Sequence, residues 1–456
     1  MKRREFITSA LTGATVVSTT ALSYQRIVGA NDRVRVGLIG CGGRGLDVAL
    51  LMKQAPGAEY VATCDVYAPN AQQAKQQLNP EAQVLGDFRK LLALKEVDAV
   101  HIATPDHWHG IITVLACQAG KDVYVEKPLA HNIKEGRAMV AAARKYNRIV
   151  QAGLQHRSAP HYREVEQIIK SGQLGEVRFV RVWNYSNLTP NGIGNPPDSP
   201  VPEGLDWDFY LGPAPSVPFN RSRFLSTFRW FWDYAGGTIT DYGTHRFDTV
   251  HQIMGATAPK TVSATGGRFS LKDNGEMPDV LQATYEYDGF VLSYEASNLN
   301  AHGVGGRTPG QNYYAMRSKE DRPHGEAYYG TNGALFCDRI GYEIYPEPLR
   351  NAQTRKEREK PVTEYRMEAK RVQGKDATDL HTANFIECVR SRKAPNAEVE
   401  IGHRSTTVPL LGNIAYKTGH KLVWDAEKEM IIGDPEANKL LGRKARKPWD
   451  LLGQSS

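Results

Sequence analysis

One glycine-rich hexapeptide constrains the fold of this chain more than any other feature. Residues 40–45 read Gly-Cys-Gly-Gly-Arg-Gly and lie between a β-branched run at residues 34–39 and a helical pattern at residues 45–54. In dinucleotide folds the first glycine of such a turn permits the bend, the second admits a pyrophosphate, and the third allows the helix to pack closely on the strand. A glycine-rich turn without a ligand is the alternative. We expect a dinucleotide to contact Gly40, Gly42, Gly43, Arg44 and Gly45.

Short β-branched runs alternate with helical periods up to about residue 155. The sequence predicts strands at residues 34–39, 59–64, 99–103, 122–125 and 149–152. Between them it predicts helices at residues 45–54, 68–78, 111–119 and 133–146. This alternation indicates a doubly wound parallel sheet, so residues 31–155 are expected to form an α/β Rossmann domain.

Longer strands follow, which predict a second α/β domain over residues 156–456. After a helix at residues 162–170, strands are expected at residues 176–185, 261–269, 280–287 and 290–296, and helices at residues 380–390 and 404–418. Such a run of strands predicts a large, mostly antiparallel open sheet. Residues 187–218 and 300–310 are rich in Gly, Pro or Asn and are expected to be loops, and loops of this length are often functional.

The first thirty residues have the pattern of an export signal. A basic Lys-Arg-Arg-Glu-Phe-Ile segment at residues 2–7 precedes a mild apolar stretch at residues 10–22, and small residues at 28–30 suit cleavage. This pattern predicts a twin-arginine signal peptide over residues 1–30 and a periplasmic location, because that route exports folded, cofactor-loaded proteins. A basic disordered tail is the alternative.

Composition excludes several other classes of protein. The formal charge is +7, but the leader contributes +3 of it, and the remaining cations are interleaved with acidic residues, so no nucleic-acid-binding face is indicated. No apolar run approaches the roughly 18 to 20 residues that span a bilayer. The five cysteines are scattered without a CxxC pair, so we expect neither a metal site nor a disulfide framework.

Asp65 is expected to determine whether NAD or NADP binds. It ends the second predicted strand, 20 residues after Gly45, where a carboxylate accepts hydrogen bonds from the adenosine ribose. A 2′-phosphate would meet a like charge there, which favours NAD over NADP, although Arg44 could partly neutralise a phosphate. A solvated loop aspartate is the alternative.

The loop after the next strand is expected to face the same ligand. Thr104 and Pro105 end that strand, and Asp106 is expected to cap the following helix. In an open α/β sheet the carboxyl ends of the strands face the ligand. Thr104, Pro105, Trp108 and His109 are therefore expected to line the nicotinamide ribose side of the site.

Two further motifs supply groups for acid–base chemistry. In Glu126-Lys127-Pro128 the proline ends a strand and holds the lysine at the ligand edge, where an ammonium can stabilise an alkoxide or move a proton. Asp241 and His245 stand four residues apart, which places both on one face of a helical turn. Imidazole titrates in the range needed to accept a carbinol proton, and the carboxylate could orient the ring. A surface lysine, and an N-capping aspartate beside a packed histidine, are the alternatives.

The segment at residues 228–232 reads Phe-Arg-Trp-Phe-Trp. Indole faces stack on sugar rings, so Trp230 and Trp232 are candidate substrate contacts, although such a run is as often core packing.

Taken in chain order, residues 40–45, Thr104-Pro105, Glu126-Lys127-Pro128 and residues 241–245 resemble the glucose-fructose oxidoreductase, inositol dehydrogenase and MocA (Gfo/Idh/MocA) family. The resemblance covers nearly all of the chain after the leader. The Glu-Lys-Pro segment and the Asp-x-x-x-His pair are its specific parts, whereas many dehydrogenases share the glycine turn. The stretch from His381 to Trp449 is similar to a subgroup with twin-arginine leaders.

This resemblance implies NAD or NADP as cofactor and an open sheet that often mediates dimers or tetramers, so a homo-oligomer is expected. It implies that Lys127, Asp241 and His245 are catalytic, with His245 as the base and Lys127 positioning substrate and cofactor. It also implies that Glu126 and Lys127 lie beside the cofactor, that a cis bond precedes Pro128, and that Gln155 and Arg157 face the substrate.

Three functions remain open on the sequence. An NAD-dependent oxidoreductase acting on a carbinol of a sugar, polyol or glycoside is favoured. A glycoside hydrolase or lyase that retains NAD for transient oxidation is the alternative, although that branch of the family replaces the Glu-Lys-Pro segment. A sugar-binding protein without activity is disfavoured because it has no need of Lys127, Asp241 and His245 together.

Overall fold

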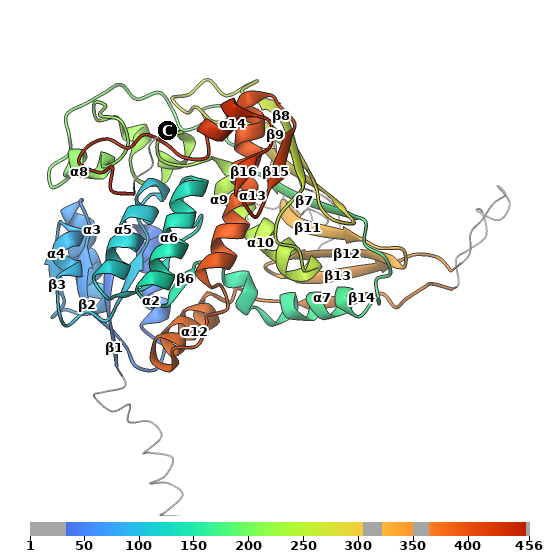
Figure 1. Cartoon of the computed structure of the whole chain (residues 1–456), viewed down its shortest axis with the longest axis horizontal. Coiled ribbons are helices and arrows are strands. Elements are labelled where there is room, and N and C mark those ends of the chain that lie inside the picture. Colours follow the sequence, from blue (N-terminus) through green and yellow to red (C-terminus); the bar gives the residue numbers. More distant parts are fainter. Residues whose placement is uncertain (1–32, 304–321, 350–363, 453–456) are drawn as a thin grey trace, which may run out of the picture.

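The computed structural model describes residues 33–303, 322–349 and 364–452. The predicted signal peptide and most of the expected loop at residues 300–310 lie outside these ranges. Two sheets with separate helical layers make up the described chain (Figure 1). Within the described residues, no helix has the length and apolar character needed to cross a membrane.

The first sheet has six parallel strands in the order β3-β2-β1-β4-β5-β6, which confirms the predicted Rossmann fold. Its strands are β1 (Val34–Ile39), β2 (Ala58–Cys64), β3 (Gln83–Leu85), β4 (Ala99–Ile102), β5 (Asp122–Val125) and β6 (Val150–Ala152). Its helices are α2 (Gly43–Met52), α3 (Ala68–Leu78), α4 (Phe88–Leu92), α5 (Asp106–Gln118) and α6 (Ile133–Lys145).

Apolar residues on both faces of the central strands explain why this sheet is covered twice. Along β1, Val36 and Leu38 pack on one side with α2, α3 and the C-terminal helix α12 (Thr378–Ser391). Ile39 packs on the other side with α5 and α6. Alternate residues of a strand point to opposite faces, so a strand that is apolar throughout must lie between two helical layers.

Among the described residues, the second sheet has ten strands and is antiparallel except for the pairing of β10 with β7, in agreement with the predicted mostly antiparallel sheet. Its strands are β7 (Phe179–Tyr185), β8 (Thr261–Gly267), β9 (Val280–Glu286), β10 (Val291–Ser297), β11 (His324–Tyr329), β12 (Gly333–Asp338), β13 (Gly341–Pro346), β14 (Lys370–Gln373), β15 (Leu422–Asp425) and β16 (Met430–Ile431). Helices α7 (Pro160–Lys170), α10 (Gly243–Met254) and α13 (Val399–Thr418) cover one face. The short helices α9 (Thr238–Asp241) and α14 (Pro435–Lys439) complete this domain.

A long excursion between β7 and α9 returns to the Rossmann domain. Residues 204–234, which we call the strap, contain α8 (Trp207–Leu211), η3 (Arg221–Arg223) and η4 (Leu225–Trp230). Leu205 forms a β-bridge with Tyr67, directly after β2. Figure 1 shows α8 above the Rossmann helices, beside the C-terminal segment. The strap therefore lies at the carboxyl edge of the first sheet, where the predicted site is located.

Candidate active site

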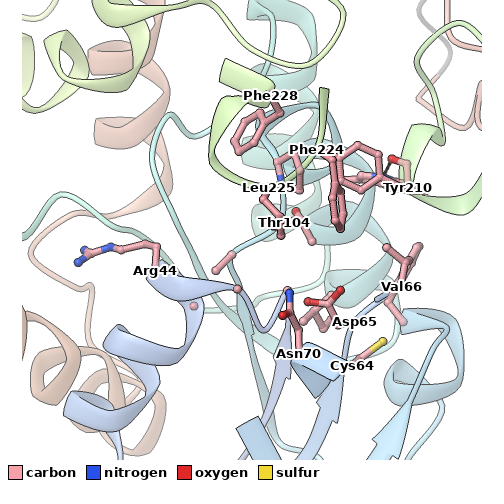
Figure 2. Close-up of a pocket in the computed structure, with 18 of the residues that line it drawn as sticks. Arg44, Cys64, Asp65, Val66, Asn70, Thr104, Tyr210, Phe224, Leu225 and Phe228 are labelled. Atoms are coloured by element: carbon pink, nitrogen blue, oxygen red, sulfur yellow. Dashed lines mark hydrogen bonds between the residues drawn. The ribbon is translucent and has the colours of Figure 1, made fainter. Parts of the chain in front are cut away.

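A cavity of about 440 Å³ lies at the carboxyl edge of the Rossmann sheet. The glycine turn, Asp65, Thr104, Pro105 and Trp108 form one wall of it. The strap forms the opposite wall with Tyr210, Phe224, Leu225 and Phe228 (Figure 2). Ser226 and Arg229 of the strap also line the cavity. The cavity is thus built jointly by the first domain and a segment of the second.

The glycine turn has the space that a dinucleotide needs. Gly40 has φ +89°, and a Cβ there would lie 2.6 Å from the carbonyl carbon of Ala103. A Cβ at Gly45 would lie 2.1 Å from the Gly40 carbonyl oxygen, so only glycine allows α2 to approach the turn this closely. Around Gly43 nothing lies within 4 Å of such a Cβ, and Gly42 has only the Asn70 amide at 4.0 Å. This open stretch before the N-terminus of α2 fits a pyrophosphate.

Asp65 binds the glycine turn directly. Its Oδ2 accepts a hydrogen bond from the Cys41 N–H at 2.7 Å and its Oδ1 accepts one from the Tyr67 N–H at 2.8 Å. Burial raises the pKa of this carboxyl above its ordinary value, against the effect of these hydrogen bonds. Figure 2 shows Asp65 and Asn70 facing the cavity on the side away from Arg44. The Arg44 side chain instead forms an ion pair with buried Glu126 at 3.0 Å, so it is not directed at the Asp65 side.

The loop after β4 divides into residues that line the cavity and residues that support it. Thr104, Pro105 and Trp108 line the cavity, and the enclosed Thr104 Oγ1 has no hydrogen-bond partner among the described residues. His109 is not among the lining residues of this cavity. Its ring bridges the carbonyl oxygens of Pro128 at 2.8 Å and Thr104 at 2.9 Å. His109 therefore ties the two loops together from behind.

The expected N-cap at Asp106 is wrong. Helix α5 begins at Asp106 itself with Pro105 in the capping position, and no side chain caps the helix. The Asp106 carboxyl is buried, and burial together with the charge of Asp241 raises its pKa to about 8.

Lys127 and Asp241 meet across the two domains. The Lys127 ammonium donates to Asp241 Oδ1 at 2.6 Å and to the Asp241 carbonyl oxygen at 2.7 Å. The guanidinium of Arg229, from the strap, pairs with Asp241 Oδ2 at 2.9 Å. Burial opposes ionisation of Asp241, but the two cations outweigh it and hold the pKa of this carboxyl below its ordinary value. Lys127 precedes Pro128 through a cis bond, as expected.

His245 lies buried in the first turn of α10. Its ring stacks on that of His156, with centroids 4.8 Å apart and planes 27° apart, and its Nδ1 has no hydrogen-bond partner among the described residues. Burial, followed by the charges of Arg339, His156, Lys127 and Arg44, holds the pKa of His245 well below its ordinary value. The imidazole is therefore neutral at physiological pH.

Asp241 does not orient His245 by a hydrogen bond, contrary to one expectation. Both carboxylate oxygens are directed at Lys127 and Arg229. Helix α9 ends at Asp241 and α10 begins at Gly243, so the two residues do not share one continuous helical turn.

Two sequence comparisons bear on this arrangement. Residues 34–154 match the description "Oxidoreductase family, NAD-binding Rossmann fold" of Gfo/Idh/MocA proteins. Residues 160–318 and 366–451 match the "C-terminal alpha/beta domain" of the same family. The chain belongs to the Gfo/Idh/MocA oxidoreductase family. Its first domain is accordingly an NAD-binding domain.

Individual relatives cover parts of the chain. Inositol 2-dehydrogenase from Salmonella typhimurium is 32% identical over 158 residues, which is 34% of this chain and 47% of that protein. A 1-carboxy-3-chloro-3,4-dihydroxycyclohexa-1,5-diene dehydrogenase from Comamonas testosteroni is 29% identical over 269 residues, or 59% of each chain. The chain thus spans about half the length of the relatives that it matches.

Solved structures share the fold at low sequence identity. The WlbA dehydrogenase from Bordetella pertussis, in complex with NADH and UDP-GlcNAcA, has a TM-score of 0.60 at 19% identity, covering 86% of this chain and 99% of that one. A levoglucosan dehydrogenase in complex with NADH and levoglucosan has a TM-score of 0.62 at 16% identity, covering 86% and 99%. These likenesses support the Gfo/Idh/MocA fold of the whole described chain.

The remaining candidate residues are not all near the cavity. Gln155 is buried in η2 (Gln155–Ser158), with its Oε1 enclosed and without a partner among the described residues. Arg157 forms an ion pair with buried Asp248 at 2.8 Å. Trp230 ends η4 and is half-buried. Trp232 lines a separate cavity of about 270 Å³, where the Lys417 ammonium lies 3.7 Å from its ring centroid.

Two contributors to the centre, Arg229 and Arg339, were missed by the sequence. Arg229 is the single cation of the aromatic run at residues 228–232, and that contrast was a usable signal. His156 stands between Gln155 and Arg157, and Arg339 follows β12 and donates to His156 Nε2 at 2.9 Å. Nothing in the sequence relates residue 339 to residue 156, because only the packing of α7, with η2 before it, against β13 brings them together.

Proposed function

We propose that this protein is an NAD-dependent oxidoreductase that interconverts a carbinol and a carbonyl group on a sugar, polyol or glycoside. The observation that carries the proposal is the Lys127–Asp241 contact of 2.6 Å at the carboxyl edge that also holds the glycine turn. NAD, when bound, supplies the hydride acceptor. The protein supplies the groups that bind the substrate oxygen and move its proton.

The described side chains suit those tasks. The Lys127 ammonium donates a hydrogen bond to the substrate oxygen and stabilises the negative charge that develops there. Asp241 holds this ammonium in place through two hydrogen bonds. His245, held as a neutral imidazole, accepts the carbinol proton. Removing one such group typically slows the reaction by about 10² to 10⁴.

NAD is proposed rather than NADP because of Asp65. A carboxylate at this edge accepts hydrogen bonds from ribose hydroxyls and repels a 2′-phosphate. Arg44 supports the same preference. Its guanidinium pairs with Glu126 and does not face Asp65, so it is not placed to neutralise a 2′-phosphate there (Figure 2).

The names of the relatives support a carbohydrate or cyclitol substrate. They include an inositol 2-dehydrogenase and a levoglucosan dehydrogenase. No specific observation favours redox-assisted glycoside cleavage.

A substrate panel tests the proposal. The full chain is mixed with NAD and a series of sugars, polyols and aryl glycosides, and nicotinamide absorbance and aglycone release are followed together. We expect the wild-type protein to form NADH with at least one carbinol. Lys127→Ala is expected to abolish this NADH formation, and Lys134→Ala, at an exposed position, is the control expected to retain it. Silence across the panel from protein that binds NAD would contradict the proposal, and aglycone release without net NADH would replace it with glycoside cleavage.

We also propose that the protein reaches the periplasm by the twin-arginine route. The Lys-Arg-Arg-Glu-Phe-Ile segment at residues 2–7 supports this. Replacing Arg3 and Arg4 by lysine is expected to retain the protein in the cytoplasm, as measured by cell fractionation. Unchanged export would contradict it.

The open face of the second sheet supports a homo-oligomer. Val291, Phe179, Tyr329, Ala334 and Tyr345 are successive partners across five neighbouring strands and so lie on one face. Phe179, Val291 and Tyr345 are each about 40% exposed, and an apolar row of this kind suits a protein interface. Light scattering is expected to give a dimer or tetramer that Phe179→Lys weakens; a monomeric wild-type protein would contradict this.

A further inference from the structure

The strap closes the cofactor cavity on the side opposite the glycine turn. Tyr210, Phe224 and Phe228 lie across the cavity from Asp65 and Asn70 (Figure 2), and Arg229 also lines the cavity. A bound dinucleotide would therefore be enclosed between two walls, of which only one belongs to the Rossmann motif.

The first anchor of the strap is made by the main chain beside Asp65. The Ala68 N–H donates to the Gly204 carbonyl at 2.8 Å, and the Asp206 N–H donates to the Val66 carbonyl at 2.9 Å. The ring of Phe224 packs edge-on against Tyr67, with centroids 5.5 Å apart. The strap is thus tied to the turn that follows β2.

A second anchor lies on α5. The Trp108 indole donates to the Tyr210 carbonyl at 3.0 Å, and the His107 N–H donates to the Tyr234 carbonyl at 3.2 Å. Phe209 packs against Trp108 and Trp449. From the C-terminal segment, Arg446 donates to the Gly212 carbonyl at 2.9 Å. The strap is therefore held at both of its ends and from behind.

The third anchor reaches the catalytic centre, where Arg229 pairs with Asp241 at 2.9 Å. Lifting the strap would break this ion pair as well as the hydrogen bonds at the other two anchors. Each of these contacts opposes movement of the strap away from the glycine turn, so release of a ligand through this wall is expected to be slow.

We propose that residues 204–234 form a second, strap-borne half of the dinucleotide site and slow the release of the bound cofactor. The proposal rests on the proposed function only in requiring that the protein bind a nicotinamide dinucleotide. Phe224 and Phe228 cover the ligand, Arg229 links the cover to Asp241, and Arg446 supports the strap from outside the cavity.

The residence time of NADH measures retention without reference to turnover. The purified full chain is loaded with NADH and mixed with a large excess of NAD, and energy transfer from tryptophan to bound NADH is followed. We expect a residence time of roughly minutes or longer in the wild-type protein. The double variant Phe224→Ala, Phe228→Ala is expected to shorten it by about tenfold or more.

Phe269→Ala is the matched control, because this phenylalanine is 69% exposed and lies outside the strap. It is expected to leave the residence time unchanged. If the double variant fails to fold, as judged by circular dichroism, Arg446→Ala loosens the strap without touching the cavity and is expected to shorten the residence time in the same direction.

Exchange complete within the mixing time of the wild-type protein would overturn the proposal. So would slow exchange that neither the strap variants nor Arg446→Ala accelerate. A protein that binds neither NADH nor NADPH would overturn this proposal and the proposed function together, whereas rapid exchange in an active enzyme would overturn this one alone.

Discussion

The Lys127 ammonium and the Asp241 carboxylate, 2.6 Å apart, join the end of a Rossmann strand to a helix of the second domain. Neither group is more than 15% exposed. A charge pair with so little solvent contact is screened weakly, so each partner fixes the position of the other. The catalytic proposal depends on this contact, because it brings residues 114 positions apart to one point beside the cofactor cavity.

Cofactor preference is expected to depend on Asp65. In Asp65→Ser the like-charge repulsion of a 2′-phosphate is removed, so the ratio of kcat/KM for NAD over NADP is expected to fall by about tenfold or more. Asp47→Asn, an exposed carboxylate on α2, is the control. Steady-state kinetics with both cofactors measure the ratio; an unchanged ratio in Asp65→Ser would refute the assigned role.

The pH profile is expected to reflect the neutral state of His245. Its pKa lies well below the ordinary value of 6.5 because of burial and the charges of Arg339, His156, Lys127 and Arg44. A histidine whose pKa is lowered on folding stays neutral as the pH falls through 6.5. The value of kcat/KM is therefore expected to show no decrease on the acid side (no acid limb) near pH 6.5.

Arg339→Gln tests the cause of this shift. Loss of one nearby cation is expected to raise the pKa of His245 and to move the acid limb upward by about half to one pH unit. Arg371→Gln, an exposed arginine on β14, is the control. An acid limb of the kcat/KM profile at pH 6.5 in the wild-type protein would argue against His245 as the base. An acid limb that does not move in Arg339→Gln would do the same.

The helix that carries His245 is supported by a buried ion pair. Arg246 lies 2.8 Å from Glu326, and both side chains are at most 3% exposed. Glu326→Ala removes the carboxylate that neutralises this buried cation, so the free energy of unfolding is expected to fall by about 3 kcal/mol or more. In Glu286→Ala, a change at an exposed site, a loss below about 0.5 kcal/mol is expected. Urea unfolding measures the free energy of unfolding of both variants. Equal losses of this free energy in the two variants would contradict the role of the ion pair.

The Rossmann domain was readily predicted, and particular residues explain why. Strands β1 and β5 and helix α3 have the bounds that the sequence predicted, because each is a compact apolar or periodic run next to a turn residue. The glycine turn and Lys127 were located by local motifs alone. Such local signals do not depend on contacts with distant parts of the chain.

Strands β11 to β14 were missed for a physical reason. Strand β11 reads His-Gly-Glu-Ala-Tyr-Tyr and is buried along nearly its whole length, so it lacks the alternation of apolar and polar residues that marks a half-exposed strand. Its buried Glu326 pairs with Arg246 and accepts a hydrogen bond from Thr249. The roles of Arg229, Arg339 and the strap likewise arise from contacts between distant segments, which no local pattern encodes.

A double-mutant cycle tests the central claim, that Lys127 and Asp241 act as one unit in the redox step. Single-turnover reduction of bound NAD by an identified carbinol substrate is measured for the wild-type protein, Lys127→Ala, Asp241→Asn and the double variant. We expect each single change to slow the step by about 10² or more, and the double variant to be no slower than the worse single variant. Losses that multiply in the double variant, or single variants that react at the wild-type rate, would contradict the account.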